Sequence, residues 1–587
     1  MPKFFVCFCF FHLISLYAQR KHKKWNQPIK RRHPGLRHLL WNLLLPGNTN
    51  CLVCSDDGRY LCLGHSGGLS VWCASSLNRV AGWLQDRLEM TSIQMTSMSK
   101  TTYLLGTVDD MGVARVFGHH SDSIHLLCVT NIMEDINKRS ICLSFELFEG
   151  GNYGAASLSC GGAVWLEIYQ FPSAAWLKEL DNAQNPNSSE WSPVTVMIQI
   201  RPPKIPTEKA LSSPPETLQP TDFLMHCLAL DIIRSSSHRL EKPPSSADEG
   251  KRKKMNESPR HCTWHFLLPC GPGDSKAEFQ PGLLVAVAVW WSGSCNLLQY
   301  FLKKTPKSSP NVDPMPDVLW PNAKEILCSA VSKCNHYIAL GLSDALVCVW
   351  DRRSGAPLSL VLMPEANSAL FRVQFVDCCP VTDDDFQIFT AEKVHLLILC
   401  KSGAIQTVTT GRGTKPSTKQ LSKRPKDSKD LPTVTASAQF LQGLSLVMQR
   451  SGKLSIQDVI NNTTVCFLTP PTTHLITTPH SPIYALNSKQ QSLFIRGDQD
   501  TSCSVTSEES SQSQLFVFRF AESDIFKQHV VSYPESTRQQ QTLSSDTLKE
   551  TCNLYLQKRA QSVEERNKTL TQTWEQLQEN PMKNCSK

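Results

Sequence analysis

A pattern of short strands separated by tight turns recurs along the chain, and its clearest copy runs from Ile326 to Leu362. Within this copy, three short apolar runs are separated by turn signals, and the turn Arg353-Ser354-Gly355 precedes a fourth run. Four short strands joined by tight turns form one blade of a β-propeller, and each blade buries its faces against its neighbours. The pattern therefore predicts an all-β chain whose successive blades close into a ring.

The third run of this copy ends in Trp350-Asp351, and Asp344 stands in the turn that precedes the run. In these residues the chain resembles the WD-repeat family, whose blades end their third strand in the same pair. The resemblance implies that Asp344 hydrogen-bonds the turn backbone and joins a buried polar network with the Trp350 indole. The copy lacks the upstream Gly-His pair of the family, so we expect an incomplete network in a degenerate WD40-like β-propeller.

Weaker copies share the spacing of this unit but not its letters. The residues that stand at the Trp350 or Asp351 position in four of these copies are Trp72, Phe117, Tyr169 and Asp458. Three further copies pass through 283–301, 394–408 and 492–520. The count is about eight units against the usual seven of the family, so both seven and eight blades remain open. A β-sandwich with coincidental turns is the alternative fold.

Of the 587 residues, 41% are hydrophobic and 19% are charged, which excludes a wholly disordered scaffold. We expect three parts: an apolar and then basic N-terminal extension over 1–38, the propeller over 39–520, and a linker with a C-terminal amphipathic helix over 521–587. Polar tracts predict disordered inserts in the propeller at about 235–259, 411–430 and 497–513.

The residues needed for catalysis or metal binding do not form a recognisable pattern. The 23 cysteines are scattered through apolar runs, which favours buried free thiols over a disulfide framework. Cys51 and Cys54 have CxxC spacing, but no second pair supplies the remaining ligands of a structural zinc. The sequence has no P-loop, GxSxG, HExxH or kinase motif. We therefore expect no catalytic, cofactor-binding or metal-binding residues, although a triad assembled from distant residues remains possible.

The N-terminal extension has three interpretations. Lys3 precedes an apolar stretch from Phe4 to Tyr17, and many basic residues follow before the first acidic residue, Asp56. An atypical start, a secretion signal and a mitochondrial presequence all fit this composition. The apolar stretch is too short to predict a stable membrane span.

The C-terminal segment predicts one long helix. From about residue 545 to 579 no Gly or Pro interrupts the chain, Ser545 can cap the start, and Pro581 follows the end. Alternating steps of four and three residues predict an a/d seam made of Leu556, Ala560, Val563, Asn567, Leu570, Trp574 and Leu577. The seam either pairs with a partner helix as a coiled coil or packs against the propeller.

The net charge of +8 is modest for this length, so we expect protein partners and no specific nucleic acid. The segment Asp109 to Phe117, together with Trp165 to Tyr169, resembles one group of WD-repeat proteins, and this implies a part among the projection components of a ciliary or flagellar axoneme. A basic tract that ends at Lys429 suits an acidic protein such as a tubulin surface as well as it suits nucleic acid.

These observations predict a noncatalytic protein–protein interaction scaffold in the cytoplasm, in a large cytoskeletal assembly such as a cilium. Two alternatives remain: a mitochondrial factor linked to the assembly of an electron-transport complex, and a secreted propeller glycoprotein.

Overall fold

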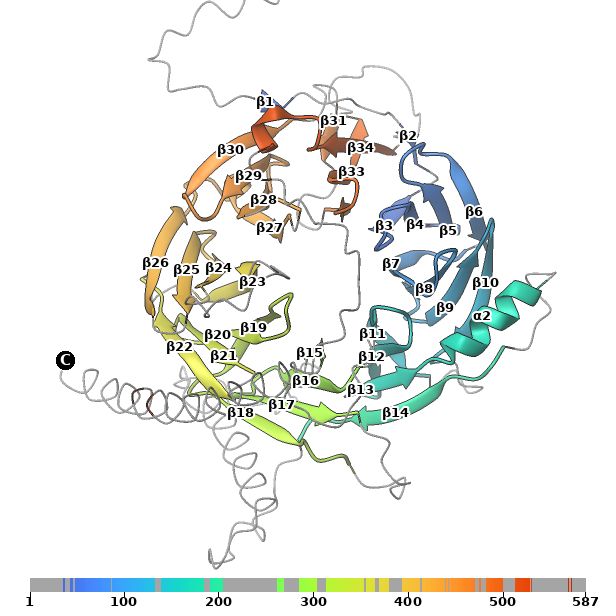
Figure 1. Cartoon of the computed structure of the whole chain (residues 1–587), viewed down its shortest axis with the longest axis horizontal. Helices are drawn as coiled ribbons and strands as arrows, with labels where there is room; N and C mark the ends of the chain where they lie inside the picture. Colours follow the sequence, from blue (N-terminus) through green and yellow to red (C-terminus); the bar gives the residue numbers. More distant parts are fainter. Residues whose placement is uncertain are drawn as a thin grey trace, which may run out of the picture.

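Eight small sheets of four or five strands surround one central axis in the described part of the chain (Figure 1). The structure is a computed structural model. It describes 35–36, 43–45, 48–131, 139–183, 191–203, 261–268, 284–302, 313–378, 393–469, 474–476, 482–499, 513–527, 529, 568 and 572, apart from short gaps at 86, 353–354, 365–368, 412–413, 439 and 442. The predicted fold class, a WD40-like β-propeller, is confirmed, and the number of blades is eight.

Each blade is built from antiparallel strands that succeed one another outward from the axis; in blade 8 the first two strands are short and both pair with the third. Blades 1 to 4 comprise β3 (Thr49–Cys54), β4 (Tyr60–His65), β5 (Gly68–Cys73) and β6 (Arg79–Leu84); β7 (Met90–Ser97), β8 (Thr102–Asp109), β9 (Ala114–His120) and β10 (Ser123–Val129); β11 (Ile141–Leu147), β12 (Tyr153–Cys160), β13 (Ala163–Gln170) and β14 (Thr195–Ile200); and β15 (Cys262–Leu267), β16 (Ala286–Trp291), β17 (Asn296–Phe301) and β18 (Val318–Pro321).

Blades 5 to 8 comprise β19 (Ile326–Val331), β20 (Tyr337–Leu342), β21 (Leu346–Asp351) and β22 (Ala356–Leu362); β23 (Leu370–Cys378), β24 (Lys393–Cys400), β25 (Ile405–Gly411) and β26 (Thr414–Ser422); β27 (Pro432–Ser437), β28 (Leu444–Gln449), β29 (Leu454–Asp458) and β30 (Thr463–Leu468); and β31 (His474–Ile476), β32 (Tyr484–Asn487), β33 (Ser492–Gln499) and β34 (Ser513–Arg519). Two short 3-10 turns cover Ser428–Asp430 and Asp524–Phe526.

The second strand of a blade is the most apolar because neighbouring blades cover both of its faces. Every residue of β8, β16 and β20 is buried. A strand that is covered on both faces reads as a continuous apolar run, whereas one with a solvent-facing side alternates. The outer strand β6 shows the second pattern, with exposed and buried residues interleaved.

The core of the protein is divided among the contacts between blades. Among the described residues, eight clusters of buried apolar side chains lie one between each pair of adjacent blades, and a small ninth cluster also joins blades 3 and 4. Because each cluster lies between two blades, the stability of the ring comes from radial packing. The surfaces near the axis and at the two faces of the ring are therefore free for other roles.

Two short strands from the N-terminal part of the chain close the ring. Strand β2 (Leu43–Leu44) pairs antiparallel with β34 of blade 8, and the N–H of Leu45 donates to the carbonyl of Ser513 at 3.0 Å. Strand β1 (Gly35–Leu36) pairs parallel with β30 of blade 7. The start of the chain thus supplies the outermost strands of the last two blades. Strand β1 lies within the segment for which we predicted a separate extension, so that boundary is displaced.

One helix, α2 (Ser173–Asn182), is inserted between β13 and β14 in the described part of the chain. It lies on the outer rim of the ring beside blades 2 and 3 (Figure 1). Trp176 is fully buried in the core between these two blades, and its indole N–H donates to the carbonyl of Ser192 at 2.9 Å. The all-β prediction omits this helix.

The insert predicted over 411–430 is wrong. Residues 414–422 form β26, which pairs along β25, and a 3-10 turn covers Ser428–Asp430. The tract reads as a loop because it has few apolar residues, but the outer strand of a blade needs few, since one of its edges faces solvent.

The other two predicted inserts fall largely or wholly outside the described residues. This is true of all of 235–259 and of most of 497–513, whose ends belong to β33 and β34. The first 34 residues and all seven residues of the predicted helical seam also lie outside them. The two described positions of the tail, Lys568 and Gln572, are helical and exposed.

Candidate functional site

A cleft of about 610 Å³ opens beside the axis of the ring between blades 2, 3 and 4. Its walls are the innermost strands β7, β11 and β15 together with the turn between β8 and β9. We call it the axial cleft. The innermost strands of all blades face the axis in Figure 1, so the cleft is built from segments that neighbouring blades bring together.

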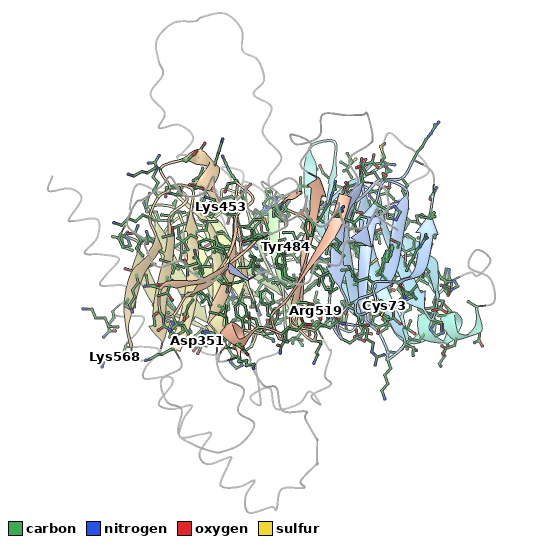
Figure 2. The ribbon with its side chains drawn as sticks, turned by 90° about the horizontal axis from the view of Figure 1, so that it is seen from above. Cys73, Asp351, Lys453, Tyr484, Arg519 and Lys568 are labelled. Carbon is green, nitrogen blue, oxygen red and sulfur yellow. The ribbon has the colours of Figure 1, made fainter. Side chains whose placement is uncertain are left out.

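One end of the axial cleft lies at a definite face of the ring. Strands alternate in direction within a blade, so the turns between second and third strands share a face with the connections between blades. Figure 2 shows Lys453, which follows the turn between β28 and β29, on one face, and Asp351, at the end of β21, on the opposite face. The turn between β8 and β9 places the mouth of the cleft on the Lys453 face.

Hydrogen bonds to Asp109 fix the turn wall of the axial cleft. One carboxylate oxygen of Asp109 accepts from the N–H groups of Met111 and Val113 at 3.0 and 2.8 Å. The other oxygen accepts from the Arg115 guanidinium at 2.5 Å. Gly112 has a φ of +69°, and a side chain there would lie 2.4 Å from Ile141, so glycine lets the turn approach β11 closely. The wall is thus held rigidly against blade 3.

Strand β11 presents two exposed apolar side chains to the axial cleft. Ile141 and Leu143 line the cleft and are 50% and 52% exposed, respectively. The two residues are two positions apart, so both face the same side of the strand, and after the break in pairing between Cys142 and Ser144 the next residue of this series, Phe145, is buried instead. Two neighbouring apolar side chains therefore remain in contact with solvent on one wall of the axial cleft.

Further along the same strand, the side chain of Glu146 brings a desolvated carboxyl group to the axial cleft. Burial raises the pKa of its carboxyl group to about 7. No hydrogen bond or ion pair to this carboxylate forms within the described ranges. An acidic group that is desolvated in a cleft and lacks a partner is typical of a functional position.

The polar groups of the axial cleft do not form a catalytic set. The hydroxyl of Thr263 lies 3.3 Å from Nε2 of His261. The two residues are two positions apart at the start of β15, so the alternation of side chains along a strand is enough to bring them together. A nucleophile and base also need a third group that orients the base, and no such group contacts His261 in the described part of the chain. No cluster of three or more potential metal ligands occurs among the described residues.

A second, smaller cavity of about 280 Å³ lies where blade 1 approaches blade 8. It is lined by the turn around Asp57 and Arg59, by Cys73 and by Gln490. Hydrogen bonds from Ser75 and Ser76 lower the pKa of the Cys73 thiol to about 7. By contrast, burial raises the pKa of Cys51 and of Cys54, the predicted CxxC pair, to about 12.

Apart from Asp344, the residues predicted as the blade signature lie on the third strands of their blades, and none of them lines the axial cleft. Trp350 is 7% exposed, and its indole N–H donates to Oδ1 of Asn322 at 3.1 Å. Asp351 is buried at the end of β21. The other members are Trp72 on β5, Phe117 on β9, Tyr169 on β13 and Asp458 at the end of β29.

The predicted role of Asp344 is wrong. Its φ is +60°, and its exposed carboxylate pairs with Nζ of Lys324 at 2.7 Å, so it takes no part in the Trp350 network. Asn322 accepts the indole N–H in its place. The turn-capping role implied by the resemblance belongs in this chain to Asp109 of blade 2.

The residues of the axial cleft were not found by sequence reasoning. Strand β11 was missed because the copy that contains Tyr169 was recognised only from the segments that form β12 and β13. The signal that could have revealed it is the apolar spacing of Ile141, Leu143 and Phe145, which precedes the turn at 148–152 by one strand length.

The comparisons with known proteins give the family. A family model described as WD repeat-containing protein 93 matches residues 49–347, which is half of the chain and covers blades 1 to 4 and the first two strands of blade 5. The chain belongs to the WD repeat-containing protein 93 family. Proteins with this type of propeller act as protein-interaction scaffolds.

Several solved structures are similar to the chain at low identity. The Saccharomyces cerevisiae Sqt1 structure is 10% identical with a TM-score of 0.43, over 82% of this chain and 97% of that one. The C-terminal WD40 domain of Sif2 is 9% identical with a TM-score of 0.42, over 81% and 97%. Chaetomium thermophilum Raptor is 9% identical with a TM-score of 0.36; the match covers 82% of this chain but only 29% of Raptor.

Among the described residues, no helix is both long enough and apolar enough to cross a membrane.

Proposed function

We propose that this chain is a noncatalytic scaffold subunit of a large cytoskeletal assembly, such as the axoneme of a cilium or flagellum, and that the axial cleft holds a segment of a partner protein. The observation that carries the proposal is the pair Ile141 and Leu143, which leave apolar surface open in a cleft with an unpaired acidic group. The resemblance of the chain to one group of WD-repeat proteins, which implies a part in an axoneme, supports the proposed location.

The division of labour within the ring supports a binding role. The eight core clusters lie between blades, so the axial cleft can be occupied without rearranging the core. A partner that covers Ile141 and Leu143 removes apolar surface from water, at roughly 25 cal/mol per Å² buried. Glu146 would favour a partner with a Lys or Arg beside its apolar residues, because an opposite charge offsets the cost of desolvating the carboxylate.

Fractionation of ciliated cells tests the place of action. The tagged full-length chain is expected to remain with axonemes after detergent extraction of membranes and cytosol. Recovery of the chain only in the detergent-soluble cytosol would overturn the axonemal proposal. Protection from protease inside intact mitochondria would favour the mitochondrial alternative, and a mobility shift after glycosidase treatment would favour the secreted one.

Variants of the axial cleft test the binding surface in the same experiment. The double variant Ile141→Ser with Leu143→Ser is expected to move into the soluble fraction. A matched control is Val196→Ser with Leu362→Ser, because these residues are similarly exposed but lie on the outer strands β14 and β22. If both double variants stay with the axoneme to the same extent as the unaltered chain, the axial cleft is not the attachment surface.

A further inference from the structure

A row of exposed basic side chains runs along the outer edge of blade 6 and onto a face of the ring. Strand β26 is the outermost strand of its sheet, and the chain continues from it through a 3-10 turn to blade 7. The exposed basic residues of this stretch, which we call the basic edge, are Lys415, Lys419, Lys423, Arg424, Lys426 and Lys429. The connection to blade 7 lies on the Lys453 face, which also holds the mouth of the axial cleft.

None of the six side chains of the basic edge forms an ion pair within the described part of the chain. The two acidic residues of this stretch are engaged elsewhere. Asp427 accepts the main-chain N–H of Lys429 at 2.9 Å and so caps the 3-10 turn. Asp430 pairs with Nζ of Lys453 at 3.3 Å. A hydrogen bond to the main chain leaves the charge of Asp427 in place, but six cations face this one carboxylate, so the basic edge keeps a net positive charge.

The basic edge sits on an ordered backbone. Strand β26 pairs with β25 from Thr414 to Ser422. Beyond the strand, Pro425 and Leu431 pack around Gly403, where an added Cβ would lie 3.1 and 2.4 Å from them. Because this backbone is fixed in the free protein, a partner does not have to order it, and less free energy is lost on binding.

The charge of the basic edge also acts on its neighbours. His395 on β24 has a lowered pKa, because of burial first and then because of the nearby charges of Lys393 and Lys419. Of the two lysines, Lys419 belongs to the basic edge, and its charge disfavours protonation of His395.

Protection of the strand edge from aggregation does not account for these residues. Lysine on an outer strand commonly prevents edge-to-edge pairing. In this ring, however, the outermost strands β1, β2, β10, β14, β18 and β22 contain no Lys or Arg, and β6 contains only Arg79. Four of the six basic residues also lie after β26 ends, where there is no strand edge to protect.

We propose that the basic edge is a docking surface for an acidic segment of another protein, one rich in Glu or Asp. This surface is separate from the axial cleft and does not rest on the axonemal proposal. Strand β26 has nine residues, so a partner chain that lies extended along it would be about 30 Å long, at roughly 3.3 Å per residue.

An acidic protein segment fits this surface better than nucleic acid or membrane. Residues 414–430 contain no Phe, Tyr or Trp on which bases could stack. The stretch also exposes no large apolar side chain that could enter a lipid surface, since Leu421 is partly buried. Carboxylates can pair with the spaced cations without either requirement.

Binding of a fluorescein-labelled peptide of ten glutamates to the full-length chain tests the proposal, measured by anisotropy at 50 mM and 200 mM salt. The test variant is Lys415→Gln with Lys419→Gln and Lys423→Gln. The control carries the same loss of charge at exposed positions elsewhere, as Lys100→Gln with Lys178→Gln and Lys489→Gln. Thermal melting shows that both variants fold.

We expect the test variant to bind the glutamate peptide roughly tenfold more weakly at 50 mM salt, because each exposed ion pair contributes about a two- to threefold factor. The control should change binding by less than twofold. Equal weakening in both variants would mean that only net charge matters and would overturn the proposal. Tighter binding of a twenty-nucleotide oligo-dT, or of vesicles with phosphatidylserine, than of the glutamate peptide would overturn it in favour of those partners.

Discussion

Replacement of Trp350 by alanine tests the central packing argument for blade 5. The side chain is 7% exposed, and its ring packs edge-to-face on Trp320 with centroids 5.2 Å apart. Removal of a buried Trp side chain leaves a cavity and costs about 3–5 kcal/mol. The indole N–H of Trp350 also donates to Oδ1 of Asn322, which is itself buried. The substitution therefore leaves this oxygen without its hydrogen-bond donor. We therefore expect a loss in the free energy of unfolding near the upper end of this range.

Two further variants separate the contributions to this loss. Trp350→Phe keeps an aromatic ring in the core but removes the indole N–H, and it should cost about 1–3 kcal/mol because Oδ1 of Asn322 loses its donor. Asp344→Ala should cost no more than about 1 kcal/mol, because its ion pair with Lys324 is exposed. The second value departs from the network role that the sequence implied for Asp344.

Urea unfolding of the full-length chain, followed by tryptophan fluorescence and circular dichroism, measures these differences. Both probes must report one transition before the free energies are compared, since a large ring can unfold in steps. The reasoning is refuted if Trp350→Ala unfolds at the same urea concentration as the unaltered chain. It is also refuted if Asp344→Ala is as damaging as Trp350→Phe, because that would return Asp344 to the buried network.

Two pH-dependent predictions follow from buried titratable groups. Burial raises the pKa of Glu146 to about 7, so its contribution to stability is lost as the pH rises from about 4.5 through 7. At pH 8 the Glu146→Gln variant should therefore be more stable than the unaltered chain by about 2–3 kcal/mol and should melt at a higher temperature. At pH 4.5 the two proteins should melt alike. Burial lowers the pKa of His265 to about 4, and its ring bonds to Oγ of Ser329 at 2.7 Å. Its contribution is present above pH 6.5 and lost as the pH falls toward 4, so His265→Asn should show a shallower decline in melting temperature over that window than the unaltered chain. A slope between pH 6.5 and 4 that is unchanged in His265→Asn, or a Glu146→Gln variant that melts lower at pH 8, would contradict the assigned protonation.

The strands within each blade could be predicted because they are local features of the sequence. The apolar runs 337–342 and 346–350 correspond to β20 and β21 almost residue for residue. Neighbouring strands of this kind are joined by turns of a few residues, so short-range pattern and turn chemistry are enough to specify them. The same reasoning located all eight blades, although it left the number at seven or eight.

Local pattern failed where the environment of a segment comes from elsewhere in the chain. Strand β26 was predicted as a loop, because its partner β25 rather than its own composition makes it a strand. Strand β2 has two residues, and it pairs Leu43 with Leu515, so no sequence window near it indicates that it closes the ring. Asp344 and Asp109 both stand in turns before a third strand, yet only Asp109 caps its turn.

The sequence by itself determined the repeated blade and hence the ring, because each blade is built from contacts between residues close in the chain. The axial cleft was decided only by the tertiary structure. Its walls come from residues near 91–94, 109–112, 141–146 and 261–264, which lie far apart in sequence and meet only when three blades pack around one axis. The raised pKa of Glu146 has the same origin, because the desolvation of a carboxylate depends on what surrounds it in space and not on its neighbours along the chain.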